Sequence, residues 1–208
     1  MNYRFDRSSL HELRDKATRA KNAYWPDYVF IHINKTAGSS IERALGLRFE
    51  HKTAREKRDE LGVARWRKVF KFAFVRNPWD KVISHYHFRV RTNQTGMGVG
   101  QISFPDWIRA AYRDRDPRYY DKPLMFAPQA DWLTDESGDL IVDFIGRFET
   151  LREDFAALSK VLGTSPQLPH LKPSMHVDCR NYYDAETRHV IAEHFRTDCR
   201  MFGYTASP

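Results

Sequence analysis

The sequence predicts an α/β fold in which helices cover both faces of a central parallel sheet, giving three layers. Apolar runs rich in β-branched and aromatic residues alternate along the chain with segments of helical periodicity, and this alternation is typical of parallel strands joined by helices. The length of 208 residues, without a Pro/Gly/Ser-rich linker, favours one domain spanning residues 1–208. Ligands of such sheets bind beyond the carboxyl ends of the strands, so a functional site is expected in the segments that follow strands.

Local patterns mark the individual strands and helices. Strands are predicted at residues 28–33, 47–51, 69–75 and 140–148. Capping residues mark three helix starts: Thr53 with Glu56, Thr150 with Glu153, and Asn77 with Pro78. The first strand is followed by a helix with Ile41 and Leu45 on one stripe, which ends at Gly46. The glycine-rich segment 91–101 is predicted to be a mobile loop.

Composition limits the classes of function. The formal net charge of +7 is compatible with an anionic ligand. Nucleic acid is disfavoured, because the chain has no unbroken Lys/Arg block, zinc-finger spacing or aromatic-basic RNA signature. No window approaches the roughly 20 apolar residues of a membrane span. Residues 1–22 lack the apolar core of a secretory signal and are predicted to form an amphipathic helix.

Cysteine usage gives no sign of a metal site or a disulfide framework. Cys179 and Cys199 are the only cysteines, and neither has a partner at C-x-x-C spacing. We therefore predict no metal and expect a cytoplasmic location.

The stretch "HINKTAGSS" (32–40) joins the first predicted strand to its helix. Amides around Gly38, Ser39 and Ser40 would point into the concavity of a helix N-terminus, which favours a phosphate, and Lys35 adds a positive charge. ATP-hydrolysing P-loops read G-x-x-x-x-G-K-[ST], whereas here the lysine precedes the glycine by three residues. The turn therefore indicates phosphate binding of another kind, with a ligand-free strand-to-helix turn as the alternative.

A second stretch, "RNPWDKVISHY" (76–86), follows the strand predicted at 69–75. Its helix carries an apolar stripe, and Ser84 lies off that stripe on the side of Asn77 and Lys81. Arg76 and Ser84 could therefore hold one anion together. The alternatives are a surface ion pair for Arg76 and an ordinary surface hydroxyl for Ser84.

Together these two stretches resemble the sulfotransferases that use 3′-phosphoadenosine 5′-phosphosulfate (PAPS), especially the carbohydrate-type (Golgi-type, family 2-like) branch. That family has a first motif like H-I-P-K-T-A-G-T-S and a second like R-N-P-x-x-R-x-x-S-x-Y. The segments "DFIGRFETL" and "RMFGY" are also similar, so the resemblance covers nearly the whole chain. It implies a P-loop-like fold, PAPS as donor and 3′-phosphoadenosine 5′-phosphate (PAP) as product.

The resemblance also implies which residues bind the donor. The second motif would hold the 3′-phosphate through Arg76 and Ser84. The first motif would hold the 5′-phosphosulfate through Lys35, Thr36, Ala37, Gly38, Ser39 and Ser40. Two departures stand out: Asn34 replaces the usual proline, and Lys81 replaces the usual arginine, which exchanges a bidentate fork for a point charge.

Sulfuryl transfer to an alcohol requires stabilisation of the leaving phosphate and removal of the acceptor's proton. Lys35 is predicted to stabilise negative charge on the bridging oxygen. His51 is the predicted base, because it ends the strand predicted at 47–51 and an imidazole titrates near neutrality. Related enzymes use a histidine or glutamate from the corresponding segment. The competing candidates are Glu50, Glu56, His85 and His87.

The remaining site predictions concern the acceptor and the nucleotide. Gln129 in "FAPQADWL" is a candidate for binding the acceptor, a hydroxyl-bearing carbohydrate or other small polar molecule. By resemblance, the nonperiodic segment that contains Lys172, Ser174 and His176 would close over the nucleotide. A small-molecule kinase of the P-loop class and a noncatalytic anion- or glycan-binding module are the alternative functions.

Overall fold

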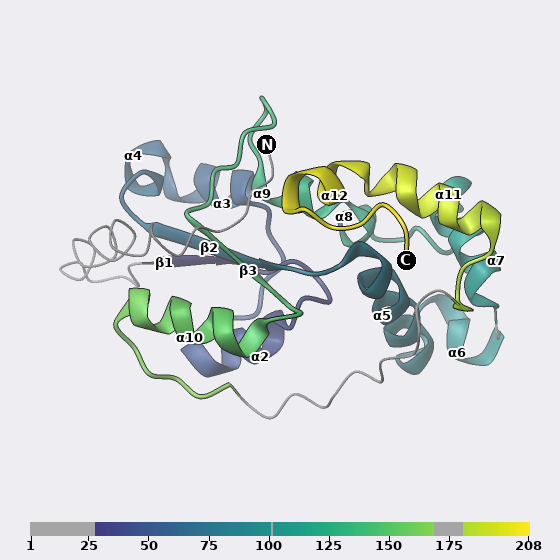
Figure 1. Ribbon diagram of the computed structural model, residues 1–208, viewed down its shortest axis with the longest axis horizontal. Helices are drawn as coiled ribbons and strands as arrows, with labels where there is room; N and C mark the ends of the chain where they lie inside the picture. The colour runs from purple at the N-terminus through teal and green to yellow at the C-terminus, as the bar shows by residue number, and fades with distance from the viewer. Residues whose placement is uncertain (1–27, 101, 169–180) are drawn as a thin grey trace. The chain divides into compact units, whose positions relative to one another are not determined.

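The computed structural model describes residues 28–100, 102–168 and 181–208 (Figure 1). Their contacts form two compact units. The sheet unit comprises residues 28–76 and 129–168, and the helical unit comprises residues 77–128 and 181–208. The single domain of residues 1–208 stays a prediction. The helix predicted in residues 1–22 lies outside the described residues.

The sheet unit contains three parallel strands, β1 (Tyr28–Ile31), β2 (Phe70–Val75) and β3 (Phe144–Arg147), in the order β1-β2-β3. Phe72 of the central strand pairs with Phe30 on one side and Phe144 on the other. Every residue of β2 is buried, as expected for a parallel strand covered on both faces. The predicted parallel sheet is confirmed.

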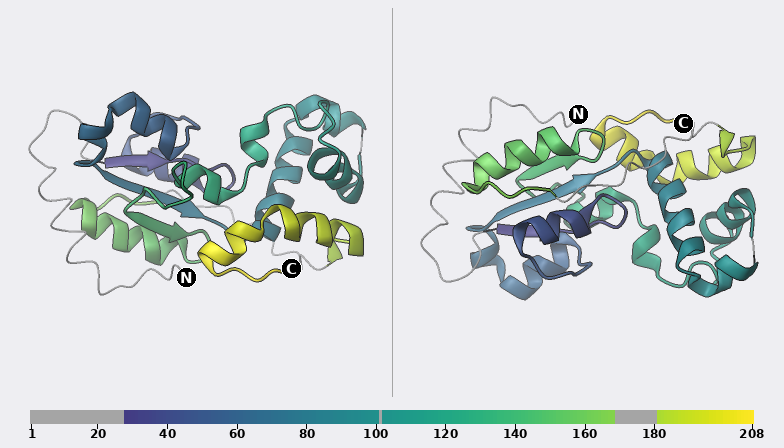
Figure 2. Two further views of the ribbon diagram at one scale, coloured as in Figure 1. Left: turned by 90° about the horizontal axis from the view of Figure 1, so that it is seen from above. Right: turned by 90° about the horizontal axis from the view of Figure 1, so that it is seen from below.

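Helices cover both faces of this sheet (Figures 1 and 2). Helices α2 (Gly38–Leu45) and α10 (Leu151–Leu162) lie on one face, and α3 (Ala54–Leu61) with α4 (Val63–Trp66) lies on the other. On the α2/α10 face, Ile41, Phe155 and Leu158 pack into a cluster with the strand phenylalanines. Helix α9 (Gln129–Leu133) begins the second stretch of the unit. The predicted three-layer α/β fold is therefore confirmed.

The strand predicted at residues 47–51 is wrong. This segment has no strand structure, and Phe49 is 65% exposed. Side chains hold it instead: the Glu50 amide donates to the carboxylate of Glu42, and the His51 ring bonds to the His32 carbonyl oxygen. The β propensity of "LRFEH" is thus overridden by tertiary hydrogen bonds.

The predicted capping boxes have different outcomes. Thr53 and Glu56 form the predicted box at the start of α3. At Thr150 the box is wrong, because the hydroxyl donates to Asp154 rather than accepting the amide of Glu153. Helix α10 nevertheless runs to Leu162, with Gly163 after it as predicted.

The helical unit is built around α5 (Pro78–Arg91). The Asn77 side chain accepts the amide hydrogen of Trp79, so the predicted start of this helix is confirmed. The segment predicted as a loop at 91–101 contains the short helices η2 (Gln94–Gly96) and α6 (Met97–Gly100). The unit continues with α7 (Phe104–Ile108), η3 (Arg109–Arg113), α8 (Pro123–Phe126), α11 (Ala185–His194) and α12 (Arg196–Phe202).

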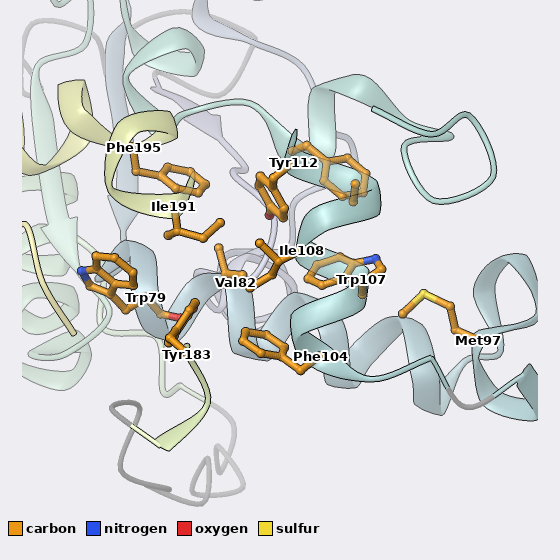
Figure 3. Close-up of a cluster of buried hydrophobic side chains, with 12 residues drawn as sticks. Trp79, Val82, Met97, Phe104, Trp107, Ile108, Tyr112, Tyr183, Ile191 and Phe195 are labelled. Atoms are coloured by element: carbon orange, nitrogen blue, oxygen red, sulfur yellow. The ribbon is translucent and has the colours of Figure 1, made fainter. Parts of the chain in front are cut away.

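An aromatic core holds the helical unit together (Figure 3). Trp79 and Val82 from α5 meet Phe104 and Trp107 from α7, with Phe195 at the end of α11. Within the described parts of the chain, no helix has the length and apolarity to cross a bilayer. The cytoplasmic location stays a prediction.

Candidate functional site

The turn between β1 and α2 has an unusual backbone. Lys35 (φ 67°) and Ala37 (φ 69°) both lie in the left-handed region, which costs energy for residues other than glycine. Between them, the fully buried Thr36 donates its hydroxyl hydrogen to the Ile33 carbonyl oxygen at 2.8 Å. Strained backbone of this kind is characteristic of functional turns. In such a turn, successive backbone amides can point into one concavity, where an anion can bind.

Helix α2 begins without a side-chain cap. Its N-cap is Ala37, which has no side-chain oxygen, and its first turn has no acidic residue. The Ala37 carbonyl accepts the amides of Ser40 (2.9 Å) and Ile41 (3.2 Å), whereas the amides at the very start of a helix, here those of Gly38 and Ser39, have no partner within the helix. Ser39 is exposed and Ser40 is half-buried. This end of α2 therefore offers amide and hydroxyl donors, together with the positive end of the helix dipole, to an anion.

Gly38 is required for a steric reason. A Cβ atom placed on it would lie 1.8 Å from Cδ2 and 2.0 Å from Nε2 of His32. The glycine lets the His32 imidazole pack directly against the first residue of α2, so the ring and the helix start are fixed against each other.

Arg76 leaves the carboxyl end of β2 and reaches the first turn. Its guanidinium donates from Nη1 to the Lys35 carbonyl oxygen at 3.3 Å and lies 4.0 Å from the centre of the Phe148 ring. The residue is buried, at 7% exposure, which excludes the alternative of a surface ion pair. A permanent positive charge is thus held beside the strained turn.

Gln129 holds the end of β2. The side-chain oxygen of this fully buried residue accepts the Arg76 amide hydrogen at 2.9 Å, and its side-chain nitrogen donates to the Arg76 carbonyl oxygen at 2.8 Å. Both ends of the amide group are engaged with the backbone of Arg76. We therefore assign Gln129 to positioning Arg76 and do not retain the predicted contact with the acceptor.

His51 is half-buried and has a defined tautomer. Its Nδ1 lies 2.8 Å from the His32 carbonyl oxygen, which can only accept, so Nδ1 carries the hydrogen and the neutral ring has its lone pair on Nε2. None of the described residues hydrogen-bonds to that Nε2. Burial lowers the pKa of His51, although the bond to the His32 carbonyl opposes the shift. The ring is therefore neutral at physiological pH and able to accept a proton.

The comparisons with known proteins identify the family. Residues 26–205 match the profile described as "Sulfotransferase family". The chain belongs to this family. A curated relative from Archaeoglobus fulgidus, described only as an uncharacterized protein, is 34% identical over 97 residues, which are 47% of this chain and 70% of the relative. No solved structure matches the chain. Membership indicates a sulfotransferase with an acceptor substrate.

Sequence reasoning missed a buried pair in this sulfotransferase, His32 and Glu42. The His32 Nδ1 lies 2.8 Å from the Glu42 carboxyl, and both residues are 4% exposed. Burial, with His51 nearby, lowers the pKa of His32 to about 3, while burial raises the pKa of Glu42 to about 7. The sequence signal that could have indicated this pair is the position of Glu42, which directly follows Ile41 of the apolar stripe in a short helix.

Two of the competing base candidates have other partners. The Glu50 carboxylate forms ion pairs with Lys57 and Lys52. The Glu56 carboxylate accepts the Thr53 amide hydrogen at 2.6 Å within the capping box. His51 is therefore the base candidate of the sheet unit whose geometry fits proton abstraction best.

The other two candidates belong to the helical unit. His85 is buried against the rings of Trp107 and Phe126. The ring of His87, which is exposed, bonds to the Tyr182 hydroxyl at 2.8 Å. These contacts are typical of structural histidines.

The second motif contributes two further residues in the helical unit. Ser84 is half-buried on α5, and its hydroxyl has no hydrogen bond to the described residues. Lys81 is 1% exposed, with its ammonium 5.5 Å from the centre of the Phe195 ring. The lysine that replaces the family's arginine is therefore an interior residue of this unit. Lys172, Ser174 and His176 lie outside the described residues.

Proposed function

We propose that this sulfotransferase moves a sulfuryl group from PAPS to a hydroxyl of a carbohydrate or other small polar acceptor and releases PAP. The single observation that carries the proposal is the uncapped start of α2, which lies next to a buried Arg76 bonded to the Lys35 carbonyl. Within the same unit, His51 presents a free Nε2. An anion site and a neutral base are the two elements that sulfuryl transfer to an alcohol requires.

The first motif is the proposed site for the 5′-phosphosulfate. Donors at the start of α2 would bind its oxygens, with hydroxyls supplied by Ser39 and Ser40. Lys35 would face the bridging oxygen, where negative charge grows as the sulfur–oxygen bond breaks. Thr36, Ala37 and Gly38 would complete this site. Thr36 also ties the turn to the Ile33 carbonyl, and Gly38 leaves room for the His32 ring.

The second motif is the proposed site for the 3′-phosphate. Arg76 supplies a guanidinium that is already positioned by Gln129. Ser84 is assigned from the motif spacing, and its hydroxyl is available for a ligand. Contacts of Lys172, Ser174 and His176 with the nucleotide rest on the family resemblance.

His51 is the proposed general base. Its Nε2 would take the hydroxyl proton as the acceptor oxygen attacks sulfur, and the bond from Nδ1 to the His32 carbonyl would stabilise the resulting imidazolium. Phe49, which is 65% exposed, lies with its ring 4.9 Å from that of His51. An exposed aromatic ring beside the base suits the apolar face of a sugar, which favours a carbohydrate acceptor.

Calorimetric titration with PAP tests the donor assignment. Lys35→Ala and Arg76→Ala should each weaken PAP binding by about tenfold or more, since a hydrogen bond to a charged group contributes about 1.5–3 kcal/mol. Lys68→Ala is the matched control, because this exposed lysine lies near the amino end of β2. Unchanged affinity in both site variants would refute the assignment.

A further inference from the structure

Glu42 and His32 form a buried acid–imidazole pair behind the start of α2. The contact joins the His32 Nδ1 to the Glu42 Oε1 at 2.8 Å, and the Glu50 amide also donates to that oxygen at 3.3 Å. The second carboxyl oxygen, Oε2, is buried and has no hydrogen-bond partner among the described residues. A buried carboxylate with one unsatisfied oxygen is costly, so the charged form of this pair is poorly stabilised.

The pair is in direct contact with the proposed anion site. The ring edge of His32 formed by Cδ2 and Nε2 packs against Gly38, the first residue of α2. Among the described residues, no partner hydrogen-bonds to that Nε2. A negative charge at the start of α2 would therefore lie close to an imidazole whose proton arrangement is set by Glu42.

Glu42 also lines a pocket at the surface of the sheet unit. The pocket, of about 300 Å³, lies along the edge strand β1 and between α2, α3 and α4. Its charged lining residues besides Glu42 are Arg48, Glu50, Lys57 and Arg65. Lys57 forms an ion pair with Glu50. The ring of His51, a further titratable group, lies 4.3 Å from the ring of His32.

We propose that Glu42 and His32 form a proton-binding site that couples binding of the donor's 5′-phosphate at the start of α2 to the uptake of one proton. The inference rests on the proposed function, which places that phosphate there. Glu42 lies outside the first motif. His32, which lies within it, would become a further residue that binds the donor's phosphate.

The proton balance of this step is simple. With Glu42 ionised, His32 carries its hydrogen on Nδ1 and donates it to the carboxylate, so the pair has one negative charge. One proton from solvent then adds at the His32 Nε2, and the Nδ1 hydrogen passes to Glu42. The pair is now neutral, the carboxylic acid donates to Nδ1, and Nε2–H is a donor. A bound dianion favours this state because it repels the carboxylate and attracts the new donor.

The direction of the pKa shift of Glu42 determines the pH at which proton uptake can be measured. Burial raises the pKa of Glu42 to about 7, so the carboxyl is mostly ionised at pH 8 before the anion binds. A neighbouring anion raises this pKa further and draws a proton from the buffer. Below about pH 6 the carboxyl is already protonated, and this source of uptake disappears.

Calorimetric titration with PAP at pH 8, in buffers of different ionisation enthalpy, measures the protons taken up on binding. We expect an uptake approaching one proton for the wild type and near zero for Glu42→Gln. Glu153→Gln is the matched control, an exposed glutamate in the first turn of α10, and should behave as the wild type. Equal uptake in wild type and Glu42→Gln, or none in the wild type, would overturn the inference.

A second measurement needs no variant. The Kd of the wild type for PAP should rise by up to about tenfold per pH unit between pH 8 and 9, and a flat profile would overturn the inference. Absence of PAP binding to the wild type at any pH is a different result, because it refutes the proposed function and the inference with it.

Discussion

His51 donates the hydrogen on its Nδ1 to the backbone carbonyl oxygen of His32, 2.8 Å away. This one bond connects the candidate base to the first residue of the turn that we propose binds the donor's phosphosulfate. It fixes the tautomer that leaves Nε2 available, and it orients the ring without using another side chain. The position of the base therefore depends on the same backbone that positions the anion site.

The pH dependence of catalysis should reflect the environment of His51. Because burial lowers its pKa from the usual 6.5, the imidazole is neutral and competent at pH 7 and loses competence only at lower pH. We expect kcat/KM to fall about tenfold per pH unit on an acidic limb that lies below pH 6.5, and no further rise from this group above neutrality. An acidic limb centred above pH 7 would argue against His51 as the base.

Gly38→Ala should damage both stability and donor binding. The added Cβ would lie 1.8 Å from the His32 ring, so the ring or the start of α2 must move. Overpacking of this kind costs about 1–3 kcal/mol of unfolding free energy, measurable by thermal or denaturant unfolding. Gly100→Ala is the control, since a Cβ there would meet no atom within 4 Å. Equal stability of the two variants would show that His32 does not pack against Gly38.

Gln129→Ala should weaken donor binding through Arg76. The substitution leaves the Arg76 amide and carbonyl without these partners in a buried place, which costs about 1–3 kcal/mol per group. We expect lower stability and weaker PAP binding, with little change in KM for the acceptor. Gln129→Glu provides a second case, because it keeps a side-chain oxygen that accepts the Arg76 amide hydrogen but removes the nitrogen that donates to the Arg76 carbonyl oxygen. A raised acceptor KM with normal PAP affinity would restore the role in acceptor binding.

Local patterns predicted the parts of the fold that neighbours in sequence determine. The apolar runs gave β1 and β2, and Asn77 with Pro78 marked the start of α5 because a cap depends on adjacent residues. Thr150 shows the limit of this reasoning, since Asp154 competes for its hydroxyl one residue beyond the expected partner. The location of the candidate site was predicted in the same way, because each of the two motif stretches directly follows a predicted strand, β1 or β2 in the structure.

Contacts distant in sequence could not be predicted. Gln129 meets Arg76 across 53 residues, so the sequence alone does not indicate that its amide group is already engaged. Segment 47–51 has strand-forming residues, yet its Glu50 amide donates to the Glu42 carboxylate and its His51 ring bonds to the His32 carbonyl oxygen. The Glu42–His32 pair was missed for the same reason, because a glutamate on a short helix is usually solvated and only the packing of α2 buries it.

Transfer of labelled sulfate from PAPS to a panel of sugars, glycans and small alcohols tests the central proposal, with wild type, His51→Ala and Lys68→Ala compared side by side. We expect label in a hydroxyl acceptor with the wild type and the Lys68 control, and a loss of about 10²–10⁴-fold in His51→Ala despite PAP binding near the wild-type level. Near-normal transfer by His51→Ala would remove the base from the mechanism. PAP binding without transfer by the wild type to any acceptor would contradict the proposed enzyme itself.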